Sequence, residues 1–424
     1  MLTAMIVIFV LAYTAIALEH PLKVNKSASA LVAAGLLWTL YAMSQNDPYL
    51  VAQHLGESLT DTAQIVFFLM GAMAIVELVD AHNGFDVITR RIRTSTLSSL
   101  MWMVAGISFF LSTILDNLTT TIVMISLMRK ILARQEDRLL FAGIIVIAAN
   151  SGGAWSPIGD VTTTMLWIGG QISVLATIQS VFLPSLVSLI VPLAMMAHTL
   201  RGRRFDAIEP DNDDPIQDTT EFERKLMFFL GLGVLIAVPA FKTITHLPPF
   251  TGVLFGLGIL WMAGDLVHRE KDESRKQPLT LAHALSRIDM SSLVFFVGIL
   301  LSVAVLEHTH ILASLAQWLN QAVGRVDVIV LVIGIVSAIV DNVPLVAASM
   351  GMYSLTDYPP DHLLWGFLAY CAGTGGSILI IGSAAGVAAM GLEKIRFFWY
   401  VQKISGLALT GYLAGAVLYL AMSG

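Results

Sequence analysis

Long apolar runs recur along the whole chain, and they restrict its fold more than any other feature. Each run approaches the ~20 residues that an α-helix needs to cross the hydrocarbon core of a bilayer. The runs lie at residues 4–18, 28–43, 62–79, 174–197, 226–241, 250–266, 289–306 and 397–422. Only 13% of the residues are charged, against about 25% in soluble proteins. We therefore expect an all-α, polytopic protein of the inner (plasma) membrane.

The basic residues predict the orientation, because cytoplasmic loops of membrane proteins are rich in Lys and Arg. Their clusters are Lys23 and Lys26; Arg90, Arg91 and Arg93; Arg129, Lys130, Arg134 and Arg138; Arg201, Arg203, Arg204, Arg224 and Lys225; Arg269, Lys271, Arg275, Lys276 and Arg287; Lys394 and Arg396. The stretch 44–61, which we interpret as a loop, has none. Alternation of sides then predicts that both termini lie outside and that the hydrophilic stretch 201–225 is a cytoplasmic linker. The N-terminus has no basic leader region, which favours a first transmembrane helix over a cleaved signal peptide.

Two Asp-Asn pairs, Asp116-Asn117 and Asp341-Asn342, interrupt apolar sequence within similar stretches (STILDNLTT and SAIVDNVPL). The first pair lies within residues 97–128, which have basic clusters on both sides, so a single crossing cannot explain them. Each arm beside the pair is about 15 residues, which is short for a full span. We predict a re-entrant helical hairpin with Asp116-Asn117 at its tip and a second hairpin over 326–355. Such a tip is tolerated at membrane depth only inside protein or in a water-filled cavity.

Four landmarks repeat in the same order and indicate two related halves. They are the VFF segments that lead to Glu77 and Glu307, the Asp-Asn pairs, the small-residue breaks NSGG and GTGG, and Gly159-Asp160 with Gly382-Ser383. The basic clusters predict that the two halves have opposite orientations in the membrane. The expected division is into N-terminal scaffold helices (1–61), a first inverted repeat (62–200), the linker (201–225), linking or scaffold helices (226–289), a second inverted repeat (290–396) and a C-terminal transmembrane helix (397–424).

Each half also contains a stretch that should break a membrane-spanning helix, NSGGAWSPIGD at 150–160 and GTGGSILIIGS at 373–383. Gly and Pro destabilise helix interiors, and inverted repeats with broken helices are typical of secondary transporters, which bind their substrates near the midplane. We expect the hairpin tips to meet these breaks. The candidate ion- and proton-binding residues are Asp116, Asn117, Thr120, Asn150, Ser151, Asp160, Thr163, Asp341, Asn342, Thr374, Ser377 and Ser383.

The oxygen-rich side chains of this set favour a hard cation such as Na⁺ or Li⁺. A buried carboxylate can hold either a proton or a cation, because burial favours its neutral form and a bound cation favours its charged form. We therefore expect exchange of Na⁺ (or Li⁺) for H⁺, with Na⁺ at Asp116, Asp160 and Asn150, and with Asp341 carrying protons or completing the shell. No basic residue lies in 98–128, 139–170, 327–356 or 363–391. This disfavours the main alternative, a Na⁺-coupled carrier of a dicarboxylate or oxyanion. Hairpins that enter the membrane without crossing it disfavour a third function, a cation channel.

These motifs resemble those of the ion transporter superfamily, and most closely those of its NhaD-type sodium/proton antiporters. The resemblance covers roughly residues 60–420, and its most distinctive part is NSGGAWSPIGDVTTTMLW at 150–167. In the dicarboxylate branch of the superfamily the hairpin tips carry Ser-Asn-Thr, where this chain has Asp116-Asn117 and Asp341-Asn342. The resemblance implies a homodimer in which a transport domain moves like an elevator against a scaffold.

Several of these residues also have a structural interpretation. The aspartates of the set are good helix caps. Glu77 and Glu307 are candidates for a proton relay, and equally for interfacial salt bridges. His82, His308 and His310 titrate near neutrality, but we interpret them as solvated residues at the membrane interface. The sequence shows no nucleophile–base pair, nucleotide loop or metal motif, so we expect no enzyme activity, no cofactor and no nucleic-acid partner.

Overall fold

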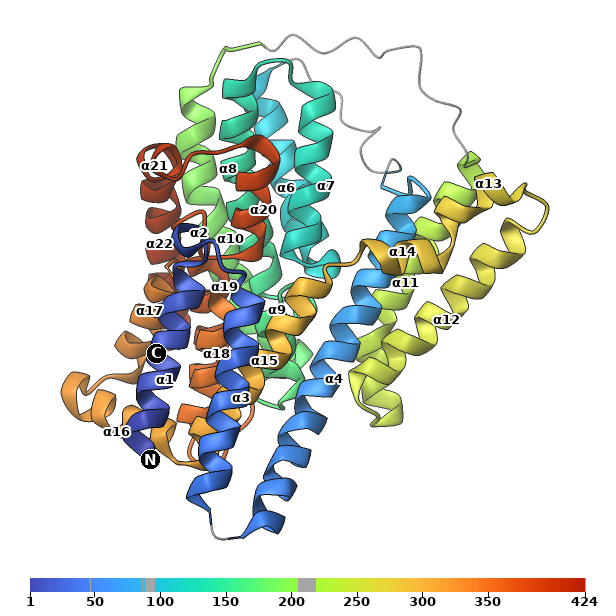
Figure 1. Cartoon of the computed structure of the whole chain (residues 1–424). Coiled ribbons are helices and arrows are strands. Elements are labelled where there is room, and N and C mark those ends of the chain that lie inside the picture. Colours follow the sequence, from blue (N-terminus) through green and yellow to red (C-terminus); the bar gives the residue numbers. More distant parts are fainter. Residues whose placement is uncertain (46, 86, 88–95, 205–218, 340, 424) are drawn as a thin grey trace.

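The computed structural model describes residues 1–423 except 46, 86, 88–95, 205–218 and 340 (Figure 1). The described chain is helical, with one isolated bridge between Thr96 and Arg204. The helices are α1 (Leu2–Ala17), α2 (Glu19–Leu22), α3 (Lys26–Ser44), α4 (Pro48–Ala81), α6 (Leu97–Leu115), α7 (Asn117–Ile131), α8 (Gln135–Ala154), α9 (Val161–Ile168), α10 (Val174–Thr199), α11 (Glu221–Thr245), α12 (Pro249–Val267), α13 (Glu273–Lys276), η1 (Gln277–Leu279), α14 (Leu281–Arg287), α15 (Met290–His308), α16 (Ile311–Val323), α17 (Val326–Val336), α18 (Asn342–Met352), α19 (Leu363–Gly375), α20 (Ala384–Glu393), α21 (Phe397–Tyr400), η2 (Val401–Ser405) and α22 (Gly406–Ser423).

Length and apolarity confirm the all-α, polytopic prediction. In the described part of the chain, nine helices are long and apolar enough to cross a membrane, and the bent pair α16 and α17 adds a tenth if it forms one span. The basic clusters near α2, the α7–α8 connection, α13 and α21 all lie in the upper half of Figure 1, as the predicted orientation requires. Arg90, Arg91, Arg93 and most of the linker lie outside the described residues.

The prediction of a loop over 44–61 was wrong, because α4 begins at Pro48 and continues as a single helix to Ala81. Asp47 starts it, with a side chain that accepts a hydrogen bond from the Tyr49 backbone N–H, and proline at the first helical position needs no hydrogen-bond partner there. The boundary that we expected at residue 62 therefore falls inside a continuous helix.

The two Asp-Asn pairs lie where pairs of shorter helices meet. Helices α6 and α7 pack against each other and against α8, and they occupy the upper half of Figure 1. Helices α17 and α18 both pack on α19 and occupy the lower half. The two pairs thus approach the middle of the molecule from opposite ends. Their re-entrant placement in a bilayer remains a prediction.

Helices α8 and α19 continue further than the sequence suggested. The glycine pair after Ser151 stays helical, and the break follows it at residues 155–160. A Cβ on Gly152 would collide with the carbonyl oxygen of Phe109 in α6, and one on Gly375 would collide with that of Gly334 in α17. The glycines therefore allow each broken helix to approach its hairpin closely, and they do not themselves unwind the chain.

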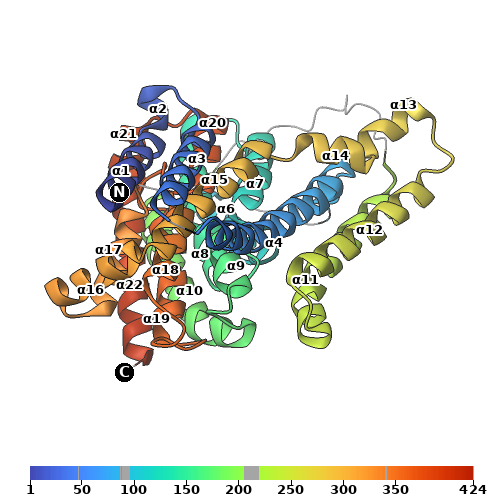
Figure 2. The ribbon, with the colours of Figure 1, turned by 60° about the horizontal axis from the view of Figure 1, so that its bottom comes forward.

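The remaining helices pack in pairs around the hairpins and the broken helices. Helix α3 packs on α15, α12 packs on α4, and α10 packs on α22. Figures 1 and 2 show α11 and α12 at the edge of the molecule farthest from α16, next to α4. The VFF helix of each half is thus packed by a helix from outside the two repeats.

Candidate functional site

Asp116 forms the bend between α6 and α7. Its backbone has φ 76° and ψ 162°, in a region that is populated almost only by glycine, so the bend is strained at this residue. Its carboxylate accepts hydrogen bonds from the Thr119 backbone N–H at 2.7 Å and the Thr119 hydroxyl at 3.1 Å. Asp116 therefore does cap α7, as the structural interpretation of this residue predicted. One carboxylate nevertheless has more lone pairs than these two bonds use.

Asp160 starts the second half of the first broken helix. Its Oδ1 accepts from the backbone N–H of Thr162 at 2.8 Å and from the Thr162 hydroxyl at 2.7 Å, which caps α9. Its Oδ2 accepts from the side-chain amide of Asn117, at the tip of the first hairpin, at 2.5 Å. Asp160 is 1% exposed. The expected meeting of the first tip with the first break is therefore seen in these contacts.

Asn150, which is fully buried, joins both halves at this point. Its Oδ1 accepts from Asn117 Nδ2 at 3.0 Å. Its Nδ2 donates to Ser377 and to Ser383, each at 2.9 Å. These serines flank the break between α19 and α20, so one amide links the first hairpin, the first broken helix and the second break.

The surroundings of this network contain space and unpartnered oxygen. Asp116 and Asp160 line a cavity of about 20 Å³, which is the size that holds one water-sized particle. The hydroxyl oxygens of Thr120 and Thr121 are buried and have no hydrogen-bond partner within the described chain. Buried polar atoms without partners are costly, so these two hydroxyls are candidates for contact with a water molecule or a cation.

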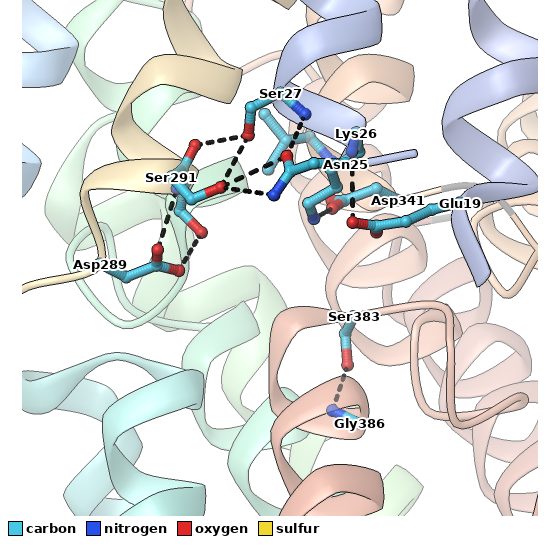
Figure 3. Close-up of polar contacts among 11 residues, drawn as sticks. Glu19, Asn25, Lys26, Ser27, Asp289, Ser291, Asp341, Ser383 and Gly386 are labelled. Carbon is cyan, nitrogen blue, oxygen red and sulfur yellow. Dashed lines mark hydrogen bonds and ion pairs between the residues drawn. The ribbon is translucent and has the colours of Figure 1, made fainter. Parts of the chain in front are cut away.

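The second tip has a basic partner that we did not predict. Lys26 Nζ lies 2.7 Å from Asp341 Oδ2 (Figure 3). Asp341 also caps α18 by accepting from the Val343 backbone N–H, and Asn342 beside it is buried. The segments that we searched do lack basic residues. Lys26 comes from outside them, and only the packing of α3 against α15 brings it to the tip.

Three predicted site residues make local contacts instead. The Ser151 hydroxyl pairs with Ser188 of α10 at 2.8 Å, on another face of α8. The Thr163 hydroxyl donates to the carbonyl of Asp160, and the Thr374 hydroxyl donates to the carbonyl of Tyr370 one turn earlier. The hydroxyl groups of these three side chains are thus engaged in these local contacts.

The two glutamates differ in their surroundings. Glu77 forms a salt bridge with Arg287, with Oε2 3.2 Å from Nε, which favours the salt-bridge interpretation. Glu307 is exposed and borders two open cavities, of about 440 and 750 Å³. His82 is fully buried beside His268, 2.8 Å between the two Nε2 atoms, so its interpretation as a solvated residue was wrong.

A family model described as "Citrate transporter" (CitMHS) matches residues 3–369. The chain belongs to this transporter family. It is 51% identical to Sodium/proton antiporter 1 of Arabidopsis thaliana over 99% of this chain and 72% of that protein, and 46% identical to Sodium/proton antiporter 2 of the same plant over 99% of both. It is 31% identical to the Na(+)/H(+) antiporter NhaD of Vibrio cholerae, over 99% of this chain and 91% of that protein. The resemblance to NhaD-type antiporters is thereby confirmed.

A solved structure also has a similar fold. The YdaH transporter of Alcanivorax borkumensis, whose crystal structure is described as having an unusual topology, matches with a TM-score of 0.54 at 13% identity. The match covers 93% of this chain and 95% of that one. At this identity the likeness concerns the fold alone.

Proposed function

We propose that this protein exchanges Na⁺ or Li⁺ for H⁺ across the cell's inner membrane. The observation that carries the proposal is the network of Asn117, Asn150 and Asp160, together with the small cavity that Asp160 and Asp116 line. The names of the NhaD-type relatives support sodium and protons as the substrates. The set of oxygen ligands supports a hard cation.

In this proposal Asp116 and Asp160 hold either Na⁺ or protons. Asp116 accepts a hydrogen bond from Thr119, and Asp160 accepts one from Thr162. These bonds hold each carboxylate in position while Na⁺ and protons exchange on it. Asn150 connects the two breaks through its hydrogen bonds, so a cation that binds beside Asp160 also affects the second half. Thr120 supplies a further hydroxyl oxygen.

We further propose that the hairpins and broken helices move together as a transport domain, against a scaffold that includes α3 and α4. The proposal includes a homodimer with both termini outside. The hairpins that approach from opposite ends support alternating access, because each tip can close the site from its own side.

The alternative is Na⁺-coupled transport of an anion, and the family description names citrate. Lys26 is the basic side chain at the second tip, and Asp341 neutralises it. An anion would therefore meet three carboxylates near the breaks and a cation that is already paired, which favours the exchange of cations.

The experiment uses purified protein in liposomes that contain a pH-sensitive dye. We expect an inward Na⁺ or Li⁺ gradient to move protons outward, and K⁺ to have little effect. Citrate added with Na⁺ should change neither the rate nor the extent. Citrate-dependent Na⁺ uptake without proton movement would replace the proposal with its alternative.

A further inference from the structure

Lys242 of α11 lies apart from the basic clusters of the chain. The sequence from 226 to 264 contains no other Lys, Arg, Asp or Glu. Within the described part of the chain, no carboxylate forms a salt bridge with its ammonium. A charge in an apolar helix is costly without polar partners, so the neighbouring helices must supply them.

The Lys242 ammonium contacts Trp167, in the last turn of α9. Its Nζ donates a hydrogen bond to the Trp167 carbonyl at 3.0 Å and lies 4.6 Å from the centre of the Trp167 ring. A cation is attracted both by the carbonyls at the end of a helix and by the face of an indole ring. The two contacts therefore act together and hold the end of α9 to α11.

Trp167 also contacts α4, on another side. It is only 3% exposed, and its ring meets the ring of Phe68 nearly edge-on, with centroids 6.3 Å apart and an angle of 80° between the planes. Helices α11 and α12 pack on each other and on α4. Lys242 and Phe68 thus come from one packed group of helices, and both contact the end of α9.

Helix α9 connects this contact to the candidate site. Asp160 caps its start, and the helix is eight residues long, or about 12 Å. A helix of two turns moves as one piece, so a displacement of Trp167 also displaces Asp160. On its other sides α9 packs on α18 and α19 of the second half.

We propose that Lys242 is a positioning residue for the exchange, which docks α9, and Asp160 with it, on α4 and α11 in one end state of the transport cycle. This inference rests on the proposed function, in which the broken helices move against a scaffold. The scaffold includes α4, on which α11 packs, whereas α9 belongs to the moving part. The contacts between Lys242 and Trp167 break when the moving part leaves this docked position, so Lys242 favours the docked position.

The experiment measures the population of the docked position from the distance between two spin labels, in purified protein in liposomes without Na⁺. Gln135→Cys at the start of α8 and Ser286→Cys in α14 carry the labels, because both positions are exposed. Cys371→Ala removes the native thiol, which is buried. Helix α8 moves with the site and α14 packs on α4, so each end state gives its own distance.

Two substitutions test the role of the charge. Lys242→Met removes it and nearly keeps the length of the side chain, whereas Lys242→Arg keeps a cation that donates hydrogen bonds and stacks on aromatic rings. The ratio of the docked to the undocked population should fall about fivefold in Lys242→Met, the effect of a cation–aromatic contact of ordinary strength. Lys242→Arg should keep the wild-type ratio. Lys403→Met is the matched control, because Lys403 is an exposed lysine of η2, and it should also keep that ratio.

A purely structural contact would lower the melting temperature of Lys242→Met and leave the distances unchanged, and this result would overturn the inference. A ratio in Lys242→Arg that matches Lys242→Met would overturn it as well, because the charge would then not be the cause. If Lys242→Met does not fold, Lys242→Gln decides in its place, since it also lacks the charge. The distances need no ion movement, so absence of Na⁺-driven proton movement in the wild type is a separate result, and it would overturn the proposed function.

Discussion

Asn150 offers a quantitative test of the idea that the two halves share one site. The change Asn150→Ala removes three hydrogen bonds, one from Asn117 and two to serines of the second half. At about 1 kcal/mol for each bond, the network loses about 3 kcal/mol. Because 1.4 kcal/mol is tenfold in an equilibrium constant, the affinity for Na⁺ should fall by about 100-fold.

A double-mutant cycle with Ser383 isolates the bond between the halves. Ser383 makes two relevant bonds, one from Asn150 and one from the Gly386 backbone N–H at 3.2 Å. Ser383→Ala should therefore cost about 2 kcal/mol. The double variant loses the shared bond only once, so it should bind Na⁺ about fivefold more tightly than the product of the single effects, a coupling of about 1 kcal/mol.

The assay is calorimetric titration of Na⁺ into the purified wild type, both single variants and the double variant at one pH. Asn150→Ala with Thr177→Val is the control cycle, because Thr177 in α10 donates to the Ser173 carbonyl and contacts neither residue of the pair. In this control cycle, the effects of the two substitutions on the affinity for Na⁺ should multiply. If the Asn150–Ser383 effects also multiply within about twofold, Asn150 does not couple the halves and the reasoning fails.

Three further predictions follow from the same structure. Asp160→Asn should abolish Na⁺-driven proton movement while thermal unfolding changes little, because Asn also caps helices; retained exchange would remove Asp160 from the site. Burial lowers the pKa of His82, at the end of α4, to about 4, below the value of about 6.5 in an unfolded chain, so stability should be full above pH 6.5 and decline towards pH 4. Melting curves in detergent measure this decline, and His82→Gln should flatten it; equal slopes would contradict the argument. Glu393 is buried between Arg129 and Arg138, at 2.8 and 3.2 Å, so Glu393→Gln should lower the free energy of unfolding by about 2 kcal/mol, and unchanged melting would show that the pairs contribute nothing.

The sequence predicted those parts of the fold that depend on local patterns. Apolar length predicts spanning helices, and the Asp-Asn pairs do mark the places where helix pairs meet. The extent of α4 was missed because a stretch without basic residues was taken as a loop, whereas Asp47 and Pro48 start a helix there.

The site was predicted less completely, for a physical reason. The residue types of Asn117, Asn150 and Asp160 indicated a polar centre, and their contacts agree with that expectation. Sequence cannot say towards which face of a helix a side chain points in a wholly buried segment, and Ser151 follows Asn150 but faces α10. Lys26 was missed because it lies 315 residues from its partner and looked like an ordinary loop lysine.

The central claim is that Na⁺ and protons compete for Asp116 and Asp160, and proton release by the protein itself tests it most directly. Purified protein in weakly buffered detergent solution receives Na⁺, and a pH indicator reports the protons released. The account predicts stoichiometric release in the wild type, with Li⁺ acting like Na⁺ and K⁺ inactive, and a loss of release in Asp160→Asn. Na⁺ binding that releases no protons from the wild type would contradict it.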